Sequence, residues 1–227
     1  MSERFRSTRA AVTVACCALA LAASAPIAAG GYERGYRVTV TNLTGGNQFT
    51  PVLAATHTPE AAFFVLGDAP SDPLATLAET GSTAPLQDVL ESLDAVSSAL
   101  TAPGPDGGLT FAGHTVSFEI DASRRARRLS VAAMILPTND AFVAVDSVPL
   151  PRRGSRTVYA LGYDAGSEGN DELCASIPGP LCGDDGEGPA GEGFVHVSRG
   201  IQGIGDVPAA EYDWRNPVAK VTITRIR

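Results

Sequence analysis

The side chains best suited to chemistry in this sequence are three carboxylates placed at or just after predicted strands. Asp140 follows one apolar run, Asp164 ends another, and Glu168 comes four residues after Asp164. Calcium takes about six to eight oxygen ligands, usually carboxylates together with carbonyl oxygens and water. Gly166 lets the backbone turn, so that the carboxylates of Asp164 and Glu168 can point to the same side. Acidic turns of this kind are often only solvated, so the spacing alone allows a calcium site or a surface loop.

No recognisable catalytic motif accompanies these carboxylates. His57, His114 and His196 are isolated from one another, and the nucleophile motif Gly-x-Ser-x-Gly is absent from the sequence. The alternative to a binding protein is a hydrolase in which Asp164 acts as general base and a divalent ion activates water. That alternative needs a pocket with convergent polar groups, which no motif announces. We therefore expect a protein that is not an enzyme.

The elements that must position the carboxylates are predicted to be strands. Apolar and polar residues alternate over 36–41, 115–120 and 220–224, which is the period of a half-buried strand. Longer apolar runs are typical of core strands, and they span 49–55, 61–66, 129–136, 141–145 and 158–163. Weaker strands are expected at 109–111 and 194–197. Many short strands without alternating helices predict an all-β fold, an antiparallel β-sandwich.

One helical insertion, at about residues 71–100, is expected to interrupt the strands. Asp72 and Pro73 are suited to the N-cap and the first position of a helix. A second helix is predicted after Thr83, because apolar residues recur at helical spacing as far as Leu100. The run Pro103-Gly104-Pro105 would end it.

The N-terminus has the pattern of a secretory signal peptide. Three arginines precede Ala10, the next sixteen residues carry no charge, and small residues follow as far as Gly30. The apolar run is shorter than the roughly 20 residues that a transmembrane helix needs, and we expect no transmembrane segment. We therefore predict a signal peptide over 1–29, a single domain over 32–227, and export to the periplasm, the cell surface or the medium.

Charge and cysteine content fit an exported protein. The formal net charge is −8, and removing the leader leaves 14 basic and 24 acidic residues, a net charge of −10. This balance argues against a nucleic-acid partner. Cys174 and Cys182 would be the only cysteines left. In an oxidising compartment they suggest one disulfide that fixes a loop, with two reduced thiols as the alternative.

Two further charged segments allow two interpretations each. The acidic segment 183–188 is either a second cation loop or, by our preference, a solvated loop. The segment Arg124-Arg125-Ala126-Arg127-Arg128 is the only basic cluster of the predicted mature chain. It is either a solvated turn or a docking surface for an acidic partner or an anionic surface.

Several segments resemble spondin domains, the modules found in F-spondin and mindin and, as stand-alone exported proteins, in bacteria. The most specific are Leu136-Pro137-Thr138-Asn139-Asp140 and Tyr163-Asp164-Ala165-Gly166-Ser167-Glu168. The strand 36–44, the element 54–57 and the segment 213–219 also resemble bacterial members. The resemblance covers essentially residues 36–226.

This resemblance implies a C2-like antiparallel β-sandwich that binds one calcium ion. Matched position by position, the family's calcium ligands fall on Asp140, Asp164 and Glu168, where animal members carry Asp in place of Glu168. The resemblance also implies a role in adhesion or recognition. We therefore expect an extracellular or cell-surface protein or glycan as partner.

Overall fold

The computed structural model describes residues 34–183 and 186–227, which lie within one compact unit of the chain. The predicted signal peptide lies outside the described residues. The strands are β1 (Arg34–Asn42), β2 (Gln48–Phe49), β3 (Val52–His57), β4 (Val96–Ala102), β5 (Thr115–Ala122), β6 (Arg128–Leu136), β7 (Ala141–Pro149), β8 (Ser155–Asp164), β9 (His196–Val197) and β10 (Ala219–Arg225). The helices are α1 (Asp72–Thr80), α2 (Ala84–Glu91), the 3-10 turn Cys174–Ser176 and α3 (Ala209–Tyr212). The fold is all-β with a short helical insertion, as predicted.

The strands form two antiparallel layers that are joined through β8. Hydrogen-bonded neighbours follow the order β4-β3-β6-β7-β8-β10-β1-β5, while β2 pairs with β6 and β9 with β8. The first part of β8 pairs with β10 and its last four residues pair with β7, so this strand belongs to both layers. At the other edges the layers also meet, because the Ser123 N–H donates to Ser97 Oγ at 2.8 Å. The sandwich is therefore nearly closed.

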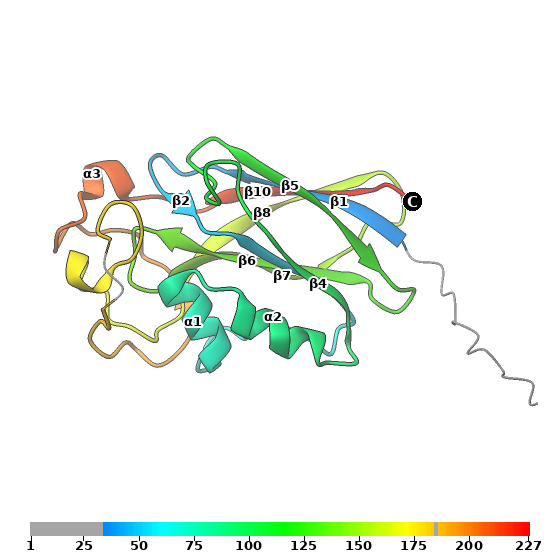
Figure 1. Cartoon of the computed structure of the whole chain (residues 1–227), viewed down its shortest axis with the longest axis horizontal. Coiled ribbons are helices and arrows are strands. Elements are labelled where there is room, and N and C mark those ends of the chain that lie inside the picture. Colours follow the sequence, from blue (N-terminus) through cyan, green and yellow to red (C-terminus); the bar gives the residue numbers. More distant parts are fainter. Residues whose placement is uncertain (1–33, 184–185) are drawn as a thin grey trace, which may run out of the picture. The chain divides into compact units, whose positions relative to one another are not determined.

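Burial on one face or on both explains the two apolar patterns in the sequence. Strand β1 buries Tyr36, Val38 and Val40 between the two layers, and its alternate residues are less buried. Strand β6 is buried from Leu129 to Leu136, because its opposite face packs under the helices. Figure 1 shows α1 and α2 lying along the outside of the layer that contains β6 and β7.

The helical insertion is shorter than predicted. Helix α1 begins at Asp72 as expected, but the capping side chain is Ser71, whose Oγ accepts from the Leu74 N–H. Helix α2 ends at Glu91, and the residues from Val96 form the edge strand β4 paired with β3. The prediction of one helix as far as Leu100 is therefore wrong, because pairing with β3 outweighs the helical spacing of the apolar residues. Within the described ranges, no helix is long and apolar enough to cross a bilayer.

Two other predicted strands are loops. Residues 61–66 form no strand, although Ala61 and Phe63 are buried and Phe63 packs into the core beneath the helices. The Phe63 N–H donates to Asp146 Oδ1 at 3.0 Å, so a side chain replaces a ladder partner. Residues 109–111 contribute only two isolated bridges, between Phe49 and Thr110 and between Asp106 and Leu109.

Candidate metal centre

The fold brings Asp140 and Asp164 together at one end of the sandwich. Asp140 lies in the turn between β6 and β7, and Asp164 is the last residue of β8. Ala141 is the register partner of Asp164, and the Ala165 N–H donates to the Asp140 carbonyl at 3.1 Å. Thr138 fixes the turn, because its Oγ1 donates to the Ile135 carbonyl at 2.5 Å and accepts from the Ala141 N–H at 3.1 Å. Two of the three predicted ligands are therefore neighbours.

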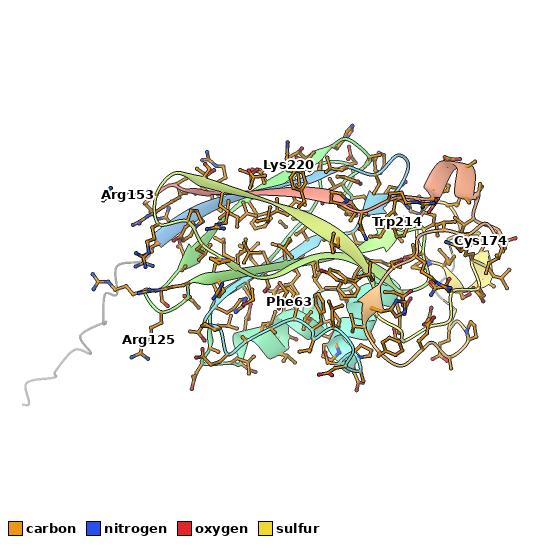
Figure 2. All side chains as sticks on the ribbon, turned by 180° about the vertical axis from the view of Figure 1, so that it is seen from behind. Phe63, Arg125, Arg153, Cys174, Trp214 and Lys220 are labelled. Atoms are coloured by element: carbon orange, nitrogen blue, oxygen red, sulfur yellow. A yellow bond between two sulfur atoms is a disulfide. The ribbon has the colours of Figure 1, made fainter. Side chains whose placement is uncertain are left out.

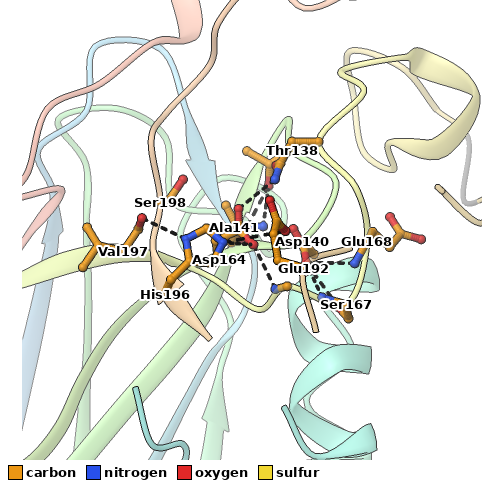
Figure 3. A network of polar contacts seen from close by, with 12 residues as sticks. Thr138, Asp140, Ala141, Asp164, Ser167, Glu168, Glu192, His196, Val197 and Ser198 are labelled. Atoms are coloured by element: carbon orange, nitrogen blue, oxygen red, sulfur yellow. Dashed lines mark hydrogen bonds and ion pairs between the residues drawn. The ribbon is translucent and has the colours of Figure 1, made fainter. Parts of the chain in front are cut away.

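The carboxylate of Asp140 is fully buried, and its two oxygens differ in their hydrogen bonding (Figure 3). Its Oδ2 accepts from the Ser167 N–H at 2.8 Å, the Ser167 hydroxyl at 3.3 Å and the Glu168 N–H at 3.0 Å. Its Oδ1 is buried and accepts no hydrogen bond from the described residues. A buried carboxylate oxygen without a donor is costly, so this atom is suited to a cation.

The electrostatics of the pair favour a cation as well. Burial, together with the nearby Asp164 carboxylate, raises the pKa of Asp140 to about 7. Burial also raises the pKa of Asp164, against the opposing effects of Asn170 and His196. Among the described residues, neither aspartate forms an ion pair with lysine or arginine. The site therefore holds two close carboxylates with little positive charge to balance them.

Glu168, the third predicted ligand, contributes its backbone and directs its side chain elsewhere. Its N–H binds Asp140 Oδ2, while its carboxylate accepts from the Gly188 N–H at 2.8 Å. In Figure 3 the Glu168 carboxylate points away from Asp140 and Asp164. Burial raises the pKa of Glu168. Its role as a ligand stays a prediction, since using it would require its side chain to leave Gly188.

The structure adds two residues that the sequence analysis did not assign. Strand β9 pairs with β8 so that His196 is the register partner of Asp164. One oxygen of Asp164, one of Glu192 and a ring nitrogen of His196 lie within 4.8 Å of one another. The His196 Nε2 is buried without a hydrogen bond, 3.5 Å from Asp164 Oδ1 and 3.7 Å from Glu192 Oε2. An imidazole beside carboxylates also suits transition metals, so the donor set does not restrict the site to calcium.

The groups around His196 also affect its protonation. Burial by itself would lower the pKa of His196, but the Val197 carbonyl and the carboxylates of Asp164 and Glu192 raise it overall. Without a metal ion, a protonated His196 would partly balance the acidic groups around it. No local motif signals this residue, because only the pairing of β9 with β8 brings it to the site.

His57, Ser130 and Asp146 also lie in contact, but these residues have a structural role. His57 Nε2 lies 2.8 Å from Ser130 Oγ, and that hydroxyl donates to Asp146 Oδ1 at 2.6 Å. His57 and Ser130 are completely buried, so a substrate has no access to them. These contacts satisfy polar groups inside the sheet.

The predicted disulfide is present and fixes a loop near this end of the chain's fold. Cys174 and Cys182 are bonded, with a sequence separation of 8 residues. The enclosed Ile177 is fully buried in the core between the layers. The acidic segment 183–188 follows directly, and Asp184 and Asp185 lie outside the described residues.

Comparison with models of protein families identifies the family of the chain. A family model described as Spondin_N matches residues 36–169, more than half of the chain. The chain therefore belongs to the spondin N-terminal domain family. A comparison with curated proteins found no match. The matched segment includes Asp140, Asp164 and Glu168, whereas Glu192 and His196 lie beyond it.

Proposed function

We propose that the chain is an exported, non-enzymatic recognition module that binds one calcium ion through Asp140 and Asp164. The observation that carries this proposal is the buried Asp140 Oδ1, which has no donor among the described residues and lies beside a second buried carboxylate. Hydrogen bonds to Asp140 Oδ2 hold the carboxylate in place, so Oδ1 is preorganised for a ligand.

Two arguments propose a third carboxylate ligand, and they name different residues. Family resemblance assigns Glu168, whose side chain would have to exchange the Gly188 N–H for the ion. Proximity favours Glu192, which lies with Asp164 in the acidic group containing His196. When bound, calcium would neutralise the carboxylates and hold the turn before β7 and the loop after β8 in one arrangement.

The proposed role of the ordered loops is recognition outside the cell. Membership in the spondin family and the disulfide support an extracellular location, because disulfides persist in oxidising compartments. The partner is proposed to be an extracellular or cell-surface protein or glycan. Mass spectrometry of the exported protein tests this location, and it should find an N-terminus between residues 26 and 31.

Calorimetric titration of the mature protein with calcium tests the site directly. We expect one binding event per chain and a higher melting temperature with calcium. Asp164→Asn should abolish the binding heat, whereas the exposed Asp88→Asn on α2 should leave it unchanged. Parallel variants Glu168→Gln and Glu192→Gln identify the third carboxylate. Absence of both binding heat and thermal stabilisation in the wild type would refute the proposed site.

The group formed by Asp164, Glu192 and His196 favours a second candidate, a metal-assisted hydrolase on the same scaffold. Glu192 is exposed and His196 is half-buried, so one carboxylate of this group reaches the solvent. In that function a carboxylate such as Asp164 would accept a proton from water. Screening ester, glycoside and peptide substrates separates the candidates. Turnover that disappears in Asp164→Asn would establish the hydrolase instead of the recognition module.

A further inference from the structure

Arginine side chains converge on a hollow at the end of the sandwich opposite the carboxylates. The hollow has a volume of about 670 Å³. Arg125 and Arg127 line it from the connection between β5 and β6, and Arg128 from the start of β6. Arg152 and Arg153 line it from the connection between β7 and β8. Arg34 at the start of β1 and Arg225 at the end of β10 also line the hollow. We call these seven residues the arginine cluster.

The arginine cluster and the candidate metal centre lie at opposite ends of β8. This strand of ten residues starts just after Arg153 and ends at Asp164. At about 3.3 Å per residue, the two sites are roughly 30 Å apart. Figure 2 shows Arg125 and Arg153 at one end of the molecule and Cys174 at the other. The cluster is therefore separate from the proposed calcium site.

No arginine of the cluster is paired with a side-chain carboxylate of the described residues. Arg37, Arg215 and Arg227 form ion pairs with side-chain carboxylates, and none of these three arginines belongs to the cluster. The cluster holds half of the 14 basic residues of the predicted mature chain, whose net charge is −10. Glu60 and Asp94 line an adjoining hollow with Arg125, and Asp121, the register partner of Gly35, is paired with Arg227. Like charges gathered in this way repel one another unless an anion is bound.

Several arginines are held by carbonyl oxygens, which fix a guanidinium without neutralising it. Arg225 Nη1 donates to the Arg152 carbonyl at 2.6 Å, and Arg127 Nε donates to the Arg124 carbonyl at 3.4 Å. Arg225 Nε also donates to the main-chain carboxylate of Arg227 at 3.1 Å, so the charge of this one arginine is partly balanced. Arg128 Nη1 donates to the Ser147 carbonyl at 3.2 Å. These bonds use only part of each guanidinium, and its remaining N–H groups stay available for an oxyanion.

The backbone around the hollow is also cross-linked. The Leu150 N–H donates to the Arg127 carbonyl at 2.9 Å, which joins the two arginine-bearing connections. The Arg225 N–H donates to the Gly154 carbonyl at 2.9 Å, which joins the second connection to β10. The buried Tyr36 and Pro151 also line the hollow. The arginines therefore extend from a fixed frame, which reduces the entropy lost on binding.

We infer that the arginine cluster binds a compact anion carrying two or more closely spaced phosphate or sulfate groups. Guanidinium groups match such oxyanions through paired N–H donors, and they stay charged at any physiological pH. A single phosphate would engage only a few of the seven arginines, whereas an oligophosphate or a multiply phosphorylated sugar can engage most of them. The concave shape and the acidic remainder of the molecule favour a compact ligand over an extended polyanion.

Calorimetry with inorganic tripolyphosphate tests this inference. The mature protein is titrated without calcium, because tripolyphosphate chelates the ion, so the result is independent of the proposed calcium site. We expect tripolyphosphate to bind at least about tenfold more tightly than orthophosphate, with an affinity that falls as salt is added. The double variant Arg152→Gln/Arg153→Gln should weaken binding by more than about tenfold, since each lost charged hydrogen bond costs about that factor.

A matched control and two competing outcomes complete the test. Arg156→Gln changes an exposed arginine of β8 outside the hollow and should leave the affinity within about twofold. Melting temperatures of all variants show whether each one folds. The inference is overturned if tripolyphosphate does not bind, or if Arg156→Gln weakens binding as much as the double variant. Binding to vesicles of anionic phospholipid without binding to tripolyphosphate would overturn it in favour of a membrane surface.

Discussion

Replacing Asp140 by asparagine should stabilise the calcium-free protein at alkaline pH and abolish its response to calcium. Asparagine keeps an oxygen for the three donors that Oδ2 accepts, from Ser167 and Glu168, and it removes the charge beside Asp164. The pKa of Asp140 rises from its ordinary value of 3.8 to about 7. These roughly three pKa units correspond to at most about 4 kcal/mol of unfolding free energy.

The sign of the pH dependence follows from the raised pKa of Asp140. Between about pH 4 and about pH 7 the folded protein holds a proton that the unfolded chain releases. The calcium-free wild type should therefore lose stability as the pH rises through this window. The raised pKa of Asp164 acts in the same direction. Asp140→Asn should be much flatter across the window and more stable than the wild type near pH 8.

Urea unfolding at about pH 5 and about pH 8, with a chelator and with excess calcium, measures these differences. Calcium at about 100 times its dissociation constant should stabilise the wild type by about 2.7 kcal/mol at pH 8 and Asp140→Asn by far less. Asp88→Asn serves as the control, because this carboxylate is exposed on α2. A calcium-free Asp140→Asn protein that is less stable than the wild type at pH 8 would refute the reasoning, because the buried charge would then not be destabilising.

Three other substitutions test the frame that holds the site. Phe142→Ala removes a fully buried ring in aromatic contact under the helices and should cost about 3–5 kcal/mol in urea unfolding. Replacing Cys174 and Cys182 by serine opens a loop of 8 residues' separation and should cost about 2.5 kcal/mol. Gly166→Ala should cost about 2 kcal/mol or more and weaken calcium binding, because φ is +69° and a Cβ would clash with the Phe194 carbonyl oxygen.

Each of these expectations has a control and a contradicting result. Phe111→Ala changes an exposed ring and should cost less than about 1 kcal/mol, so equal losses at Phe111 and Phe142 would contradict the assigned core. Reducing agent should destabilise the wild type but not the double serine variant. Unchanged stability of Gly166→Ala would show that the loop relaxes without cost, against the close contact described above.

The sequence predicts the sandwich well because its strands differ in how many faces they bury. Alternation in β1 and continuity in β6 reflect burial on one face and on both faces. The helix predicted as far as Leu100 fails because β4 contains apolar residues at a spacing that also suits a helix. Only pairing with β3, distant in the chain, decides between the two. Local patterns carry no information on such a partner.

In the candidate site, too, local sequence patterns predict some residues, while the position of others depends on contacts that are distant in the chain. Asp140 and Asp164 are found from the sequence because each follows or ends a recognisable strand. His196 is not, because its place beside Asp164 depends on the short strand β9. The direction of the Glu168 carboxylate depends on the loop that contains Gly188. The arginine cluster is only partly visible in the sequence, since Arg152, Arg153 and Arg225 are brought to Arg125 by the fold.

Strand β8 has a consequence for the fidelity of folding. Its first part is in register with β10 and its last part with β7, so a slip by one residue would have to break both ladders at once. Such a slip would also turn every side chain to the opposite face, moving Asp164 away from Asp140. A strand at the edge of a sheet has only one partner strand to fix its register. The relative position of the two carboxylates is therefore protected by both layers of the sandwich, although the carboxylates themselves lie in loops and at a strand end.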